Sequence, residues 1–239
     1  MKKIAFVGLL LAVGTAANAG IVGNAIRITA TNSSGSGTWS LPAPTQSGWD
    51  SWSWTNRDPI VINSATGAEI ARINNLNLQF IADPVISVNF VIVAGGAATA
   101  FAIDTGELVF PAINNPAIAS ASAGITVTDL NGNLGGFTGG FAGGTKSYRA
   151  DYNGLVPGGT QYAALIDNTS VAFPFFSETG SGNASGGIVG SVTSMSAGFS
   201  FTLSANDSAA GTSVFQIVPT PGALAVLGLA GLSVARRRR

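Results

Sequence analysis

The sequence of 239 residues contains no cysteine and no histidine, and only 9% of its residues are charged. Without these side chains there is no disulfide, no thiol nucleophile, no Ser-His-Asp triad and no ordinary zinc or copper site. The chain is nevertheless 46% hydrophobic, whereas disordered sequences are poor in apolar residues. We therefore expect a folded protein that needs no metal or other cofactor.

The first 19 residues have the pattern of a secretory signal peptide. A basic start at Lys2 and Lys3 is followed by an apolar run over residues 4–13 and by a small-x-small cleavage site formed by Ala17 and Ala19. This run is too short for a membrane span of roughly 20 residues. We predict export through the secretion machinery and cleavage after Ala19.

Residues 218–239 form a second segment that stands apart from the rest of the chain. A mostly apolar run over residues 222–235 lies between two short motifs. These features are Pro219, Thr220 and Pro221 before the run, and Arg236, Arg237, Arg238 and Arg239 after it. As a helix the run spans about 21 Å, which is less than a hydrocarbon core of ~30 Å. Arginines that follow an apolar run remain on the cytoplasmic side of the membrane. We expect a short hydrophobic transmembrane helix, either retained as an anchor or removed after transient use.

This tripartite segment resembles the PEP-CTERM sorting signal of Gram-negative bacteria. The resemblance covers about 22 residues, and Thr220 stands where the motif of the family has glutamate. It implies recognition and processing by a membrane enzyme called exosortase, often alongside exopolysaccharide production. It therefore implies an exported protein at the cell envelope, at the cell surface or in the extracellular matrix. It says nothing about the activity of that protein.

Residues 20–217 remain as one domain, which at this size buries close to 70% of its unfolded surface. They contain eleven acidic and five basic residues, so the apparent neutrality of the chain becomes a net charge of about −6. Binding to phosphate backbones requires clustered lysine and arginine. We therefore expect no nucleic-acid partner.

The hydrophobic residues of this domain recur with a period of two. The alternating segments are residues 75–80, 86–92, 101–103, 125–127, 199–204 and 215–217. Turn formers separate them at residues 83–84, 95–96, 114–116, 131–132, 157–159 and 186–187. This pattern predicts an all-β fold, an antiparallel β-sandwich or jelly-roll-like single domain.

Three stretches are rich in glycine and small polar residues. Residues 31–37 and 178–187 are expected to be flexible surface loops. Residues 135–144 contain two phenylalanines among their glycines and lack the lysine of a phosphate-binding loop. We expect this third stretch to be a strand or loop that packs its aromatic rings.

All four tryptophans, Trp39, Trp49, Trp52 and Trp54, fall within sixteen residues. Trp52 and Trp54 share one face of a strand, which favours packing in or beneath a sheet. Clustered indoles also stack against sugar rings, so Trp49, Trp52 and Trp54 are candidate glycan contacts. Self-association through these rings is a third alternative.

The acidic residues give no convincing catalytic or metal site. Residues 129–133 begin like a calcium loop, but its sixth and twelfth positions are Leu134 and Gly140, so we expect a hairpin with its turn at residues 131–132. Asp104 and Glu107 are expected to flank a turn. Asp151 is expected to pair with Arg149 or to accept N–H groups of a turn.

The sequence thus favours an exported structural or adhesive protein that is not an enzyme, with exopolysaccharide as a possible partner. Two other functions stay open. The first alternative is a carbohydrate-binding module that uses the tryptophan cluster. The second is a hydrolase that uses two carboxylates, since any two acids can meet in a fold.

Overall fold

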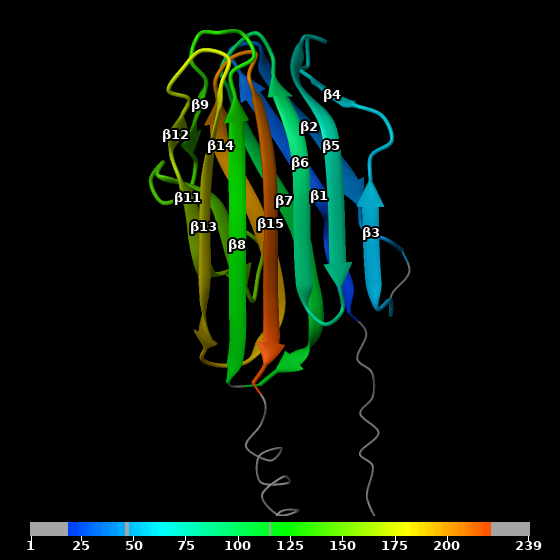
Figure 1. Ribbon diagram of the computed structural model, residues 1–239. Coiled ribbons are helices and arrows are strands. Elements are labelled where there is room, and N and C mark those ends of the chain that lie inside the picture. Colours follow the sequence, from blue (N-terminus) through cyan, green and yellow to red (C-terminus); the bar gives the residue numbers. More distant parts are fainter. Residues whose placement is uncertain (1–18, 46–47, 115, 221–239) are drawn as a thin grey trace, which may run out of the picture.

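The computed structural model describes residues 19–45, 48–114 and 116–220. In these residues fifteen strands form two antiparallel sheets that pack face to face, so the predicted all-β sandwich is confirmed (Figure 1). Strand β1 begins and strand β15 ends at the same end of the sandwich (Figure 1). Over these described ranges there is no helix with the length and apolarity to cross a membrane.

The eight-stranded sheet has the order β11-β10-β14-β7-β1-β2, and the short β9 pairs with β14 and β12. Its strands are β1 (Gly20–Asn32), β2 (Gly35–Pro42), β7 (Thr99–Ile113), β9 (Gly136–Gly139), β10 (Lys146–Tyr152), β11 (Thr160–Asp167), β12 (Thr169–Ser170) and β14 (Val192–Leu203).

The seven-stranded sheet has the order β13-β8-β15-β6-β5-β3, and β4 also pairs with β5. Its strands are β3 (Ser51–Thr55), β4 (Ile60–Asn63), β5 (Glu69–Ile81), β6 (Val85–Ala94), β8 (Ala117–Thr128), β13 (Ser177–Ile188) and β15 (Ser208–Pro219).

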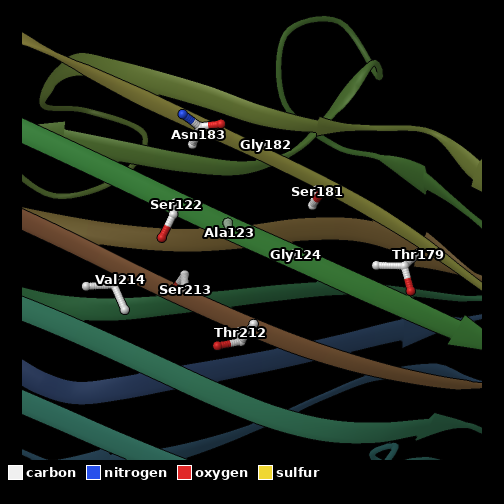
Figure 2. A pocket seen from close by; sticks show the side chains of 10 residues that line it. All are labelled: Ser122, Ala123, Gly124, Thr179, Ser181, Gly182, Asn183, Thr212, Ser213 and Val214. Atoms are coloured by element: carbon white, nitrogen blue, oxygen red, sulfur yellow. The ribbon is translucent and has the colours of Figure 1, made fainter.

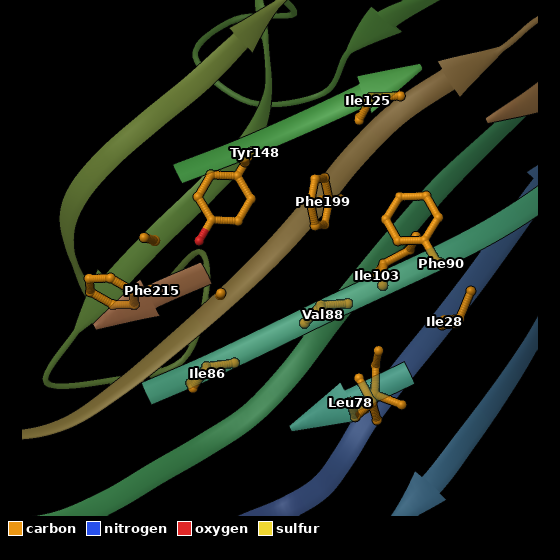
Figure 3. Close-up of a cluster of buried hydrophobic side chains, with 14 of the residues drawn as sticks. Ile28, Leu78, Ile86, Val88, Phe90, Ile103, Ile125, Tyr148, Phe199 and Phe215 are labelled. Atoms are coloured by element: carbon orange, nitrogen blue, oxygen red, sulfur yellow. The ribbon is translucent and has the colours of Figure 1, made fainter. Parts of the chain in front are cut away.

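The alternation in the sequence decides which face of each strand is buried. In residues 75–80 the two leucines and the phenylalanine are fully buried, and the amide side chains point away from the core. Figure 3 shows side chains of both sheets meeting in one layer, where Phe90 and Phe199 pack edge to face with their ring centroids 5.0 Å apart. Burying one such ring contributes about 1.5–3 kcal/mol, so this core stabilises a domain that has no disulfide.

Two of the expected loops are strands. Residues 31–37 form a tight hairpin in which only Ser33 and Ser34 lie between β1 and β2. Residues 178–187 lie within β13, which pairs with β8 along its whole length. The prediction of a turn at residues 186–187 is therefore wrong as well. These segments have no large apolar side chains, so they show no alternation of apolar and polar residues. Pairing with a neighbouring strand makes them strands.

The expected hairpin at residues 125–132 is also wrong. The chain does turn at residues 131–132, but it then crosses to the other sheet as β9, and β8 pairs with β13 and β15. The glycine-rich segment that follows packs an aromatic ring as expected, because Phe137 of β9 is buried with its ring centroid 5.9 Å from that of Phe201. The sequence predicts the turn, whereas tertiary packing decides which strand the chain pairs with after it.

Candidate functional site: an uncharged polar face

The outer face of β13, β8, β15 and β6 carries no charge and is rich in small polar side chains, with a minority of apolar residues such as Ile118 and Val214 among them. Alternate residues point outward from these paired strands, among them Ser177, Thr179, Ser181, Asn183, Ser185, Ser120, Ser122, Thr126, Thr128, Thr212, Gln216, Ser87 and Asn89. Hydroxyl pairs bridge neighbouring strands, with 2.8 Å between the Oγ1 atoms of Thr126 and Thr179. None of the outward-facing positions on these four strands is charged. The face therefore offers hydrogen-bond donors and acceptors and bears no formal charge.

A shallow hollow of about 450 Å³ lies in this face, between β13, β8 and β15 (Figure 2). It is lined by Ser122, Ala123, Gly124, Thr179, Ser181, Gly182, Asn183, Thr212, Ser213 and Val214. Gly124 supplies no side chain between Thr212 and Ser181, its partners in register on either side. A Cβ atom on Gly124 would meet nothing closer than 3.6 Å, so a side chain would fit at this position and its absence deepens the hollow.

The tryptophans lie at the other edge of the sandwich and pack against the core. Trp39 on β2 and Trp54 on β3 come from different sheets, and their ring centroids are 5.6 Å apart. Trp52 packs against Phe80, its cross-strand partner, with 5.8 Å between the centroids. Trp49 also contacts the core, and all four indoles are partly buried. The structure therefore confirms the packing interpretation, and contact with glycans stays a prediction.

The outer face of the eight-stranded sheet differs because it carries charges. Arg27, Asp104, Gly198 and Arg149 are successive partners across β1, β7, β14 and β10. Arg149 binds Asp151 on its own strand through two hydrogen bonds of 2.6 and 2.8 Å, and the Asp151 side chain is fully buried. The expected pairing of these two residues is confirmed.

Asp104 and Glu107 do not flank a turn, because both lie inside the continuous strand β7. Burial raises the pKa of Asp104 to about 6, although the nearby positive charge of Arg27 lowers it. The hydroxyl of Ser194 donates to the carboxylate of Glu107. In the described part of the chain, no group of three acidic side chains lies close enough to hold a metal ion.

A third region lies at the end of the sandwich where β8 ends and β13 begins. The buried carboxylate of Asp129 accepts four backbone N–H groups at 2.8–3.1 Å, three from residues 131–134 and one from Phe175. Burial by itself would raise the pKa of Asp129, but these four donors hold it below its ordinary value. The side chains of Phe173, Phe175 and Phe176 are 65%, 69% and 62% exposed. Sequence reasoning missed this cluster, although three phenylalanines in residues 173–176, directly before a polar segment, were a visible signal.

The two predicted sorting segments fall mainly outside the described residues. Ala17 and the whole segment from Pro221 to Arg239 are not described. Ala19 is buried and directly precedes β1, Pro219 ends β15, and the hydroxyl of Thr220 donates to the carbonyl of Pro116 at 2.6 Å. Signal cleavage, the hydrophobic helix and the sorting motif all stay predictions.

Comparisons with known proteins do not assign this chain to a family. No family model matches the chain, and no curated protein matches it. Among solved structures, a chain from the structure of the infectious bursal disease virus Gx strain is similar with 11% sequence identity and a TM-score of 0.24. The similarity covers 84% of this chain and 61% of the viral chain, so this chain spans less than two thirds of the length of that match. A likeness at this level concerns neither the function nor the partners of this protein.

Proposed function

We propose that this is an exported, non-catalytic structural or adhesive protein whose uncharged polar face contacts neutral polysaccharide. The observation that carries the proposal is the outer face of β13, β8, β15 and β6, which combines hydroxyl and amide groups with a hollow and bears no charge. A neutral sugar polymer presents hydroxyl groups that can both donate and accept hydrogen bonds. It also repeats, so many weak contacts along one chain add up to useful affinity.

The destination is part of the same proposal. The signal peptide over residues 1–19 and the PEP-CTERM-like segment over residues 218–239 support export to the cell surface or matrix, with an exosortase-like enzyme as the processing partner. The net charge of about −6 between them would repel anionic polymers. A neutral polysaccharide is therefore the better partner.

Affinity electrophoresis tests the proposed contact. The protein should be retarded in gels containing a soluble neutral glucan, and less so in gels containing an anionic polysaccharide. Gly124→Leu fills the hollow and should reduce the retardation several-fold. Thr202→Leu, an exposed position on the outer face of the eight-stranded sheet, is the matched control and should leave it unchanged. Equal effects of the two variants, or no retardation by any neutral polymer, would overturn the proposal.

A carbohydrate-binding module that uses the tryptophans is the second candidate, because the four indoles are only partly buried. Trp fluorescence should then respond saturably to a glycan, and the response should be lost when Trp49, Trp52 and Trp54 are replaced. Gly124→Leu should leave that response intact, which separates the two sites. A hydrolase is not proposed, because Asp151 is held by Arg149 and Glu107 by Ser194.

A further inference from the structure

Strand β13 is an open edge of the seven-stranded sheet. Its twelve residues pair with β8 in continuous register, and within the described chain it pairs with no other strand. Most of its residues are exposed. One side of its backbone therefore keeps N–H and C=O groups free, and such an edge is a template for another strand.

This edge lacks the features by which proteins usually prevent such pairing. Proteins protect edges with proline, lysine, bulges or very short strands. Strand β13 is long, has no bulge against β8, and contains neither proline nor lysine; Glu178 is its single charge. The opposite edge of the same sheet is divided between the short strands β3 and β4, of five and four residues. Protection is thus present at one edge, and at the other it is limited to Glu178 near the start of β13.

The inner side of β13 is already occupied. Gly180 and Gly182 point toward the other sheet, and a Cβ atom on Gly182 would lie 3.3 Å from Cβ of Leu165 on β11. The two sheets therefore close on each other behind β13. A further partner can reach this strand through its backbone edge and its outer face.

We propose that β13 pairs with β13 of a second copy of this chain in antiparallel orientation, so that two seven-stranded sheets become one. A two-fold axis normal to the sheet produces this arrangement, and residues opposite each other then point to the same face. Pairing of residues 178–188 with the same residues of the second copy places Asn183 on the axis, opposite Asn183 of that copy. It places the two Glu178 side chains at opposite ends, so these like charges do not meet.

The dimer also extends the polar face. Ser181 and Asn183 line the hollow and belong to the edge strand, so the hollow of one copy adjoins that of the other across the axis. Two adjoining faces bind a repeating polymer more tightly than one. This consequence rests on the proposed function, whereas the pairing of the strands does not.

Engineered cysteines test the pairing cleanly, because the chain has none of its own. Full-length Asn183→Cys, kept in mild detergent so that the predicted apolar segments do not associate, should give a covalent dimer with a short bismaleimide. Thr179→Cys lies away from the axis and should react with its own copy several-fold less. Thr212→Cys, exposed on the same face but within the sheet, is the control and should stay monomeric. Equal dimer yields from Asn183→Cys and Thr179→Cys would overturn the antiparallel arrangement, and no dimer from either would overturn the pairing.

A charge variant gives an independent readout. Ser181→Lys combined with Ser185→Lys places like charges around the axis, and sedimentation equilibrium should show at least tenfold weaker association. Ser120→Lys combined with Thr126→Lys adds the same charges to β8 and should leave association unchanged. A monomeric parent protein that still binds glucan would overturn this inference alone. A dimer that binds no glucan would overturn the proposed function and keep the inference.

Discussion

The ring of Phe90 lies against the backbone of its cross-strand partner Gly211, so that a Cβ atom on Gly211 would come within 2.1 Å of the ring. The same ring contacts Phe199 of the other sheet. This fit links the register of β6 and β15 to the packing of the two sheets, because a shift of one residue would bring a side chain against the ring.

Replacing Gly211 by alanine should therefore destabilise the protein, by about 1–3 kcal/mol from overpacking. Gly124→Ala is the matched control on the neighbouring strand, where the new methyl group makes only ordinary van der Waals contacts, none closer than 3.6 Å. It should be neutral or stabilising by up to about 1 kcal/mol, because alanine loses less backbone entropy than glycine. Urea unfolding of both variants checks this, and equal losses of stability would contradict the interpretation.

Asp104 should make stability depend on pH. Because burial raises its pKa to about 6, the folded protein retains a proton between about pH 4 and pH 6 that the unfolded chain has released. Stability from this group is therefore lost as the pH rises through that window, by about 2–3 kcal/mol. Asp104→Asn stays neutral and should be more stable than the parent at pH 7, with little difference at pH 4. A difference that is the same at both pH values in urea unfolding would contradict this.

Asp129 should hold the loop with exposed phenylalanines in place. Its pKa is lowered, so its contribution to stability is present above the ordinary range for aspartate and is lost as the pH falls through the lowered value. Asp129→Ala should release Phe175 at neutral pH and expose residues 171–176 to chymotrypsin. Asn133→Ala, a loop residue whose side chain is exposed, is the control. Unchanged cleavage in Asp129→Ala would show that the loop does not depend on this carboxylate.

The Arg149–Asp151 pair should be far more costly to break than to replace. Arg149→Met leaves the buried carboxylate of Asp151 without its cation, which costs about 3–5 kcal/mol. Removing the charge of Asp151 as well, in Arg149→Met with Asp151→Asn, should recover much of this loss. Thermal unfolding at pH 7 gives the comparison, and an equal loss in the single and double variants would contradict it.

Processing at the two ends can be read from the intact mass of protein extracted from the surface of its host. We expect the mass to lack residues 1–19 and most or all of the segment after Pro219. A change of Arg236 to Arg239 into uncharged residues should impair this processing, because the stop signal is lost. Mature protein that keeps the tail would instead indicate a simple membrane anchor.

The amino-acid sequence by itself determined the fold class, because strands with one apolar face reveal themselves through a period of two. It also offered the pairing of Arg149 with Asp151 as one of two alternatives, and residues two apart on a strand do share a face. These features are local, so no knowledge of distant neighbours was needed to predict them. The tryptophan cluster was visible in the same way, although its place between β2 and β3 was not.

Only the tertiary structure decided which polar segments are strands and which faces come together. Strand β13 has no apolar alternation, and its structure follows from pairing with β8. Asp104 and Glu107 fall within one strand because β7 continues through Thr105 and Gly106 between β1 and β14. The uncharged face and its hollow at Gly124 arise from four strands that are distant in sequence. Such features depend on the register between strands that are distant in sequence. The residues of a single strand do not show which other strand it pairs with.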